Sequence, residues 1–142
     1  MKSLLKECAI DFVEAAAAAG QTTLTTDVMD MQGFENVMFI ALTGDVTDTS
    51  VLTLTAFAHT ANAAAGAAIS GAVATFTADA TSADNKMLIV DVVNPGKRYV
   101  YATFARGTAN AVLSGIICIR YNGSKIPVSQ AAGLIASALA RG

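Results

Sequence analysis

The side chains that most often carry catalysis are sparse in this sequence. Its one histidine, His59, has no nucleophile or carboxylate close to it in sequence, although folding could bring one near. A catalytic histidine needs such a partner. The two cysteines, Cys8 and Cys118, lie far apart, and Cys118 sits in an apolar run that is typical of a buried free thiol. Two isolated cysteines are no disulfide framework, so we predict two free thiols.

Metal and cofactor sites find equally little support. Structural zinc needs three or four Cys or His ligands, and the whole chain has three such residues, widely scattered. Asp27, Asp30, Asp45 and Asp48 offer the oxygen atoms that calcium prefers, but their spacing is not that of an EF-hand loop, and turns favour Asp for backbone reasons. There is no phosphate-binding glycine loop and no G-x-S-x-G motif. We therefore expect no metal, no cofactor and no enzymatic activity.

The most suggestive polar residues lie in the segment RYVYATFAR, residues 98–106. In a strand, its alternation places Tyr99 and Tyr101 on one face. Arg and Tyr are the residue types that interfaces favour. We consider two interpretations. Either Arg98, Tyr99, Tyr101 and Arg106 form an interface with a partner, or the tyrosines lie half-buried with hydrated hydroxyl groups.

Composition limits the class of protein. The chain has 142 residues, a common length for one domain, and 54% of them are hydrophobic. Charged residues make up 14%, below the roughly 25% of an average domain. The net charge of −2 and the dispersed basic residues argue against a nucleic-acid partner. Such a weakly charged surface is typical of a protein that neighbours partly cover.

Two segments could suggest membranes or export. Residues 49–78 contain no formally charged residue, but they are rich in Thr, Ser and Ala and begin with the period-two alternation of a strand. We expect no membrane insertion. At the N-terminus, Glu7, Asp11 and Glu14 interrupt the apolar stretch that a signal peptide needs, which favours a product of the cytoplasm.

The elements that must position these residues read as strands separated by turns. The predicted strands cover 9–14, 22–31, 36–43, 51–60, 73–78, 86–93, 99–106 and 111–121. We predict that 36–43 and 86–93 are buried on both faces, and that the last two strands form a hairpin. Residues 15–19 should form a loop or one helical turn, and 61–71 a loop. The chain is then a single all-β domain, an antiparallel β-sandwich of jelly-roll type. Its core spans about 8–127, and 128–142 form a flexible or short-helical tail.

Three segments carry a resemblance to a known family. They are DMQGFENVMFIALTG (30–44), the turn NPGKRYV (94–100) and RGTANA (106–111). Over residues 12–128 the sequence resembles small virion proteins encoded in tailed-phage and prophage genomes, typically near the major capsid gene. The resemblance implies a jelly-roll-like capsid decoration or cement protein on the outer surface of the head. The family supplies no catalytic residues.

This resemblance sets the expectations for function. The partners would be the major capsid protein and further copies of the same chain, as a dimer or trimer. The protein would be made in the host bacterial cytoplasm and end on the capsid surface of the virion. Two alternatives stay open: a head–tail connector or tail structural protein, and a lectin-like module that binds host glycans.

Overall fold

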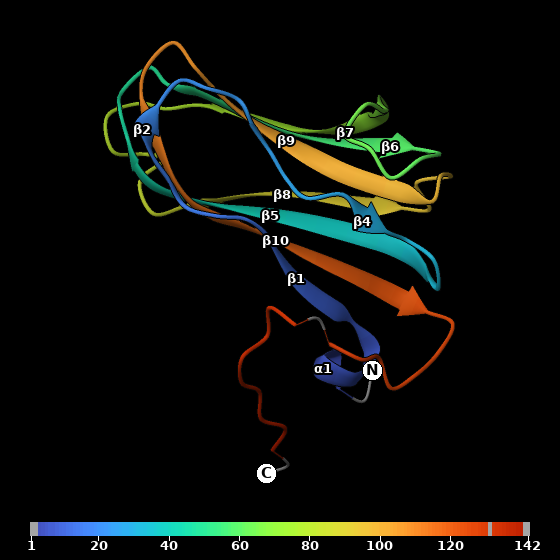
Figure 1. Cartoon of the computed structure of the whole chain (residues 1–142). Coiled ribbons are helices and arrows are strands. Elements are labelled where there is room, and N and C mark those ends of the chain that lie inside the picture. Colours follow the sequence, from blue (N-terminus) through green and yellow to red (C-terminus); the bar gives the residue numbers. More distant parts are fainter. Residues whose placement is uncertain (1–2, 131, 141–142) are drawn as a thin grey trace.

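The computed structural model describes residues 3–130 and 132–140, and nearly all of its regular structure is β-strand. The strands are β1 (Ala9–Glu14), β2 (Ala17–Gly20), β3 (Leu24–Thr25), β4 (Met29–Asp30), β5 (Phe34–Val46), β6 (Val51–His59), β7 (Ala67–Thr77), β8 (Met87–Val93), β9 (Tyr99–Gly107) and β10 (Ala111–Gly123). They form two antiparallel sheets that face each other (Figure 1). The predicted all-β sandwich is confirmed.

The strand order is that of a jelly roll. The first sheet runs β1-β10-β5-β8, with β2 also pairing with β10, and the second runs β3-β9-β6-β7, with β4 also pairing with β9. When β1 with β2, and β3 with β4, are each counted as one interrupted strand, eight strands remain. Chain order then places strands 1-8-3-6 in one sheet and 2-7-4-5 in the other. This interleaving of early and late strands defines the double-sheet jelly roll.

The predicted hairpin between the last two strands is wrong. β9 pairs with β6 in the second sheet, whereas β10 pairs with β1 and β5 in the first. The short connection between them crosses the sandwich, and Arg106 at the end of β9 donates a hydrogen bond to the carbonyl of Ala111 at the start of β10. Alternation identifies a strand and its faces, but it does not identify the neighbour with which the strand pairs.

Other predicted boundaries also change. Residues 17–20 form β2 rather than a loop or helical turn, because pairing with β10 overrides the helix propensity of alanine. β7 begins at Ala67, inside the predicted loop, and Gly71 has a φ of 78° where the pairing of β6 with β7 shifts register. The helix α1 (Leu4–Glu7) was not predicted. Among residues 128–130 and 132–140 of the tail there is no helix.

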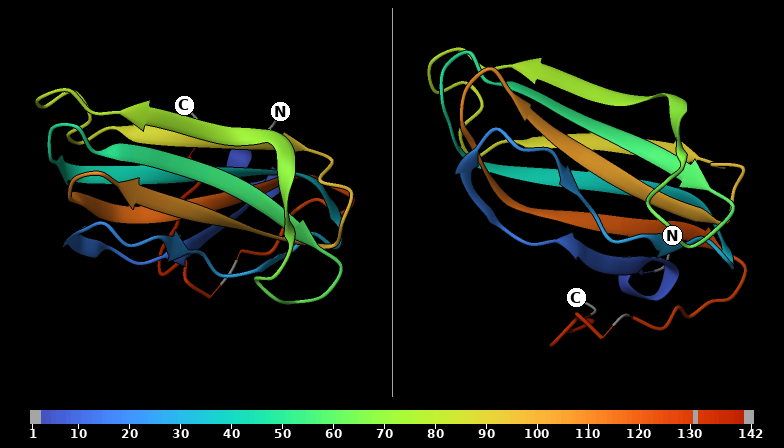
Figure 2. Two further views of the ribbon diagram at one scale, coloured as in Figure 1. Left: turned by 90° about the horizontal axis from the view of Figure 1, so that it is seen from above. Right: turned by 45° about the horizontal axis from the view of Figure 1, so that its top comes forward.

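The tail is attached beside the N-terminal segment. The Gln130 side-chain oxygen accepts a hydrogen bond from the Ile10 amide at 3.0 Å, and its nitrogen donates to the carbonyls of Leu5 and Cys8, each at 2.7 Å. The Val128 amide donates to the Lys6 carbonyl. One glutamine therefore occupies the outer edge of β1, where the chain's two terminal segments run side by side (Figures 1 and 2).

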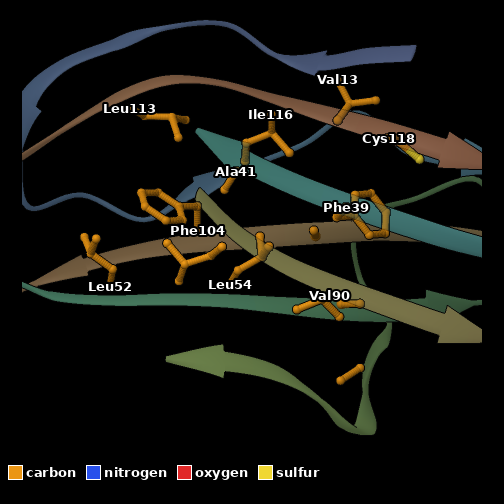
Figure 3. Close-up of a cluster of buried hydrophobic side chains, with 14 of the residues drawn as sticks. Val13, Phe39, Ala41, Leu52, Leu54, Val90, Phe104, Leu113, Ile116 and Cys118 are labelled. Atoms are coloured by element: carbon orange, nitrogen blue, oxygen red, sulfur yellow. The ribbon is translucent and has the colours of Figure 1, made fainter. Parts of the chain in front are cut away.

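The core lies between the inner faces of the two sheets (Figure 3). Its largest fully buried side chains come from both sheets: Phe39, Leu113 and Ile116 from the first, and Phe104, Leu52 and Leu54 from the second. Burial alternates along β6, as expected for a strand with one face against the core. The interdigitation of these side chains holds the sheets together.

The prediction that 36–43 and 86–93 are buried on both faces is wrong for the single chain. Burial alternates along both β5 and β8, so that only the inward side chains are enclosed. On the other face of β8, Met87, Ile89 and Val93 remain 59%, 45% and 71% exposed. Their apolar character is that of a buried strand, whereas their position is on the surface.

Candidate interaction surfaces

The four residues predicted to form an interface occupy two different environments. Arg98 and Tyr99 lie at the start of β9 and stay accessible to solvent. Tyr101 and Arg106, on the same strand, are each only 4% exposed. The burial of these two side chains removes them from the surface and corrects the expectation that all four residues contact a partner.

Arg98 is held by its neighbours at one end of the sandwich. Its guanidinium donates to both carboxylate oxygens of Asp30, at 3.0 and 2.9 Å, and to the side-chain oxygen of Gln32 at 2.7 Å. It also lies 5.2 Å from the ring centre of Tyr99. The hydrogen bond from Arg98 lowers the pKa of the Asp30 carboxyl below its usual value. Beside this cluster is an open hollow of about 430 Å³, bordered by the turns at 31–35 and 94–98.

Tyr101 fixes the loop between β6 and β7. Its ring stacks on Phe57, with centres 5.1 Å apart and planes 9° from parallel. Its hydroxyl oxygen accepts a hydrogen bond from the Gly66 amide at 3.0 Å. A side-chain Cβ at Gly66 would lie 2.3 Å from the Ala58 carbonyl oxygen, so only glycine allows this close approach of the loop to β6. The residue predicted to bind a neighbour instead organises its own fold.

Arg106 connects separate segments of the chain through hydrogen bonds inside the fold. It donates to the carbonyls of Ala18, Thr22 and Ala111 at 2.7, 3.0 and 2.8 Å, and to the Thr22 hydroxyl at 2.7 Å. These partners lie on the segment after β1 and at the start of β10. Arginine suits this position because its planar fork carries five donors and keeps its charge in a buried setting. Position alone in the sequence does not distinguish it from Arg98.

A second arginine with internal partners, the partly exposed Arg120 on β10, was not singled out by the sequence. It forms an ion pair with Asp11 on β1 at 2.9 Å and donates to the carbonyl of Asp30 at 2.7 Å. Its guanidinium lies 5.0 Å from the ring centre of Phe34. Asp11 on β1 pairs with Cys118 on β10, and Arg120 lies two residues further along β10. Both side chains therefore occupy inward positions of neighbouring strands. A charged residue at an inward position is the sequence signal that could have identified this pair.

The side chains that were considered for catalysis or metal binding make local contacts within the fold or are buried in it. The His59 ring nitrogen Nδ1 accepts a hydrogen bond from the Ala61 amide at 2.8 Å and so caps the end of β6. Cys8 and Cys118 are free and buried, and burial raises the pKa of both thiols. Asp48 accepts from the backbone amide of Ala80, as its turn position favours. Within residues 3–130 and 132–140, no three His, Cys, Asp or Glu side chains gather closely enough to hold a metal ion.

The outer face of the first sheet is the most distinctive surface of the molecule. We call it the apolar face. Its members point away from the core on β1, β10, β5 and β8: Ile10, Phe12, Met38, Ile40, Leu42, Met87, Ile89, Val93, Ile117 and Ile119. The outer face of the second sheet is different, because it carries threonines such as Thr53 and Thr75, whose hydroxyls are 2.9 Å apart. Large apolar patches of this kind are typical of surfaces that contact other molecules.

No model of a known protein family matches the sequence, and no curated protein is significantly similar to it. Some solved structures resemble its fold at low identity. A protein of the disulfide-linked pili of Bacillus endospore appendages has 17% identity and a TM-score of 0.47, over 84% of this chain and 91% of its own. A subviral particle of infectious bursal disease virus gives 10% and 0.48, over 84% of this chain and 34% of its own. A tailspike domain of bacteriophage CBA120 gives 10% and 0.41, over 82% and 20%.

These likenesses are too distant to carry an argument about function. The jelly-roll assignment rests on the strand order of the chain itself. In the described part of the chain, none of the helices has the length and apolarity required to cross a bilayer.

Proposed function

We propose that this chain is a structural protein of a bacteriophage virion, and that it acts as a capsid decoration or cement protein. The observation that carries an assembly role is the apolar face, because a sheet surface of this composition is typical of a contact with a neighbour. The resemblance of residues 12–128 to small phage virion proteins indicates the kind of assembly. The jelly roll supports an assembly role without defining it, since the same fold hosts many functions.

The mechanism is stabilisation by binding. A cement protein binds the assembled lattice of the major capsid protein but not the free subunit, so it favours the assembled state by mass action. When the free concentration of the chain is 100 times its dissociation constant, binding at each site adds about 2.7 kcal/mol to the stability of the assembled state. Many identical contacts then act together through multivalency. The chain has no need of a reactive group for this task.

The exposed end of the sandwich is the surface that we assign to the capsid. Arg98 and Tyr99 lie there beside the hollow formed by the turns at 31–35 and 94–98. Arginine and tyrosine are enriched where interfaces carry most of their binding energy. The double variant Arg98→Ala and Tyr99→Ala should therefore reduce binding to particles while leaving the fold intact. Thr77→Ala at the opposite end of the second sheet, on β7, should leave binding unchanged.

The copy number in purified particles tests the proposal. The chain is quantified against the major capsid protein by mass spectrometry of virions. Hundreds of copies, in a simple ratio to the capsid protein, would support a cement protein spread over the lattice. A dozen copies or fewer would assign the chain to the neck or tail, as the alternative predicts. Absence from particles would contradict a virion role altogether.

A further inference from the structure

The edges of the two sheets differ in how they are protected against pairing with further strands. An edge strand presents unpaired backbone N–H and C=O groups, and proteins commonly blunt it with short strands, bulges or covering side chains. At β1 the Gln130 side chain accepts the Ile10 amide, and the register against β10 shifts. β3 and β4 have two residues each. β7 is interrupted by a register shift against β6, where Gly71 has a φ of 78°. Three of the four sheet edges are therefore blunted.

The fourth edge, β8, has none of these devices. It pairs with β5 along its whole length of seven residues without a register shift. Its sequence, MLIVDVV, contains no proline or glycine and only one charged residue, Asp91. Asn85 and Asn94, with φ of 52° and 51°, end the strand on either side. Within residues 3–130 and 132–140, no strand pairs with the outer side of β8. The edge is thus regular, apolar and of defined length.

The hydrogen bonds to β5 show which backbone groups of β8 are free. The Thr43 amide donates to the Lys86 carbonyl at 2.9 Å, and the Asn94 amide donates to the Glu35 carbonyl at 3.0 Å. In an antiparallel pair, residues that exchange such bonds alternate with residues that direct both groups to the other side. Even-numbered residues of β8 therefore bond to β5. The N–H and C=O groups directed to the free edge belong to the odd-numbered residues, which are Met87, Ile89, Asp91 and Val93.

A second copy of β8 matches this pattern. In an antiparallel pair about a two-fold axis at Val90, Met87 faces Val93 of the second copy. In the same pair, Ile89 faces Asp91 of the second copy. All four free residues of each chain then meet free residues, which gives about eight hydrogen bonds. An axis at Asp91 would instead place two carboxylates directly opposite each other, which is unfavourable. The strand is therefore complementary to itself in length, in hydrogen bonding and in charge.

The side of the sandwich along β8 favours a folded second copy over a lone peptide. β7 and β8 lie along the same side of the molecule (Figure 2). Phe76 on β7 is registered against the fully buried Leu52, yet Phe76 is 45% exposed. A hollow of about 210 Å³ lies between these two residues and Leu88. A single added strand extends only the first sheet, whereas a second sandwich also lies beside β7 and the exposed Phe76.

We infer that two copies of this chain pair antiparallel through their β8 strands, so that the first sheet continues from one molecule into the other. The contact uses the same strand of both chains, so it is isologous and closes as a two-fold dimer. The inference goes beyond the proposed function, because it concerns two copies of the chain and requires no capsid.

The first test is the oligomeric state of the full chain without capsids. Sedimentation velocity covers concentrations from about 0.1 to about 100 µM, a range around typical dimer affinities. We expect the wild type to reach twice the chain mass of 14.5 kDa within this range. Amide hydrogen exchange followed by NMR locates the contact. The Ile89 and Asp91 amides should exchange rapidly in the monomer and become protected as the concentration rises.

Ile89→Pro tests the backbone contact, with Ile89→Ala as its matched control. Both variants remove the isoleucine side chain, but only proline removes the N–H group. That group faces the free edge, so proline at this position leaves the bonds to β5 in place. Two intermolecular hydrogen bonds per dimer are lost. We expect the dimer dissociation constant of Ile89→Pro to exceed that of Ile89→Ala by about 30-fold.

A charge pair at the same position tests the register and does not depend on the proline variant. Ile89→Lys places an ammonium group opposite Asp91 of the second copy, whereas Ile89→Glu places a carboxylate there. Opposite charges across a strand pair attract and like charges repel. Because each pair occurs twice in the dimer, Ile89→Glu should dissociate about tenfold more readily than Ile89→Lys. Circular dichroism monitors the fold of every variant.

Three results would overturn the inference: a wild type that stays monomeric over the whole range, equal dissociation of the two charged variants, or equal dissociation of folded Ile89→Pro and Ile89→Ala. The outcome is independent of the proposed function. A β8 dimer together with no copies in virions would contradict the proposed function alone. A chain that is abundant in virions but monomeric in solution would contradict the dimer alone.

Discussion

Replacing Arg106 with methionine gives the sharpest test of how this sandwich is held together. The substitution keeps the length and apolar stem of the side chain but removes four hydrogen bonds. Those bonds connect β9 to the segment at residues 18–22 and to the start of β10. Of these bonds, the one to the Ala111 carbonyl is enclosed, and that carbonyl loses a charged donor when the guanidinium is removed.

The magnitude follows from the number and burial of these bonds. A hydrogen bond from a charged donor contributes about 1.5–3 kcal/mol, and an unsatisfied buried acceptor costs about 1–3 kcal/mol. The carbonyls of Ala18 and Thr22 are only partly buried and regain water, so the contributions do not all add. We expect Arg106→Met to lower the free energy of unfolding by about 3–4 kcal/mol. In a domain of this size that corresponds to a fall in Tm on the order of 10 °C.

Equilibrium unfolding in urea, followed by circular dichroism, measures the change. The matched control is Arg98→Met, because Arg98 also bonds through its guanidinium but its side chain is 51% exposed. An exposed ion pair contributes about 0–1 kcal/mol, so this control should stay close to the wild type. Equal losses from the two variants, or a loss below about 1 kcal/mol from Arg106→Met, would refute the conclusion that the hydrogen bonds of Arg106 hold these segments together.

Three further results are expected. Tyr101→Phe should cost about 1 kcal/mol and speed hydrogen exchange in the loop between β6 and β7, where the tyrosine hydroxyl holds a backbone amide. Burial, with a hydrogen bond to Asp91, raises the pKa of Tyr121 to about 12, so the folded state retains this proton. The stability that comes from this raised pKa is fully present below the unfolded pKa of about 10 and is lost as the pH rises toward the folded value. Absorbance at 295 nm should show that Asp91→Asn lowers the pKa of this tyrosine. Ellman's reagent should leave the buried thiols of Cys8 and Cys118 unmodified in native protein and react with both after unfolding; rapid native labelling would contradict their burial.

The sequence predicts the strands well and their partners poorly. Alternation at residues 51–59 reveals β6 directly, because its inward and outward side chains differ in polarity. The same signal cannot distinguish a hairpin from a crossing between sheets, so β9 and β10 were paired wrongly. β2 and the start of β7 consist of small residues, whose weak strand propensity is overruled by the strands beside them.

The candidate site shows the same limit. Arg98 and Arg106 have similar sequence surroundings, yet one is exposed and the other enclosed by a segment that lies more than eighty residues earlier in the chain. The residues next to Arg106 in the sequence give no sign of this long-range contact. In contrast, the apolar runs at 36–43 and 86–93 predict burial on two sides, and the folded chain supplies only one of them. There the failed prediction agrees with the proposal that a neighbour covers this face.

The hydrogen bonds of Gln130 at the edge of β1 have a consequence for how the first sheet can be extended. Gln130 occupies the Ile10 amide, so an added strand cannot extend the first sheet there without displacing the tail. β8, at the other edge, is paired on one side only within the described chain. The first sheet can therefore gain a strand more readily at β8 than beside Ile10. Removal of residues 128–140 would free the Ile10 amide at that edge for pairing with another chain.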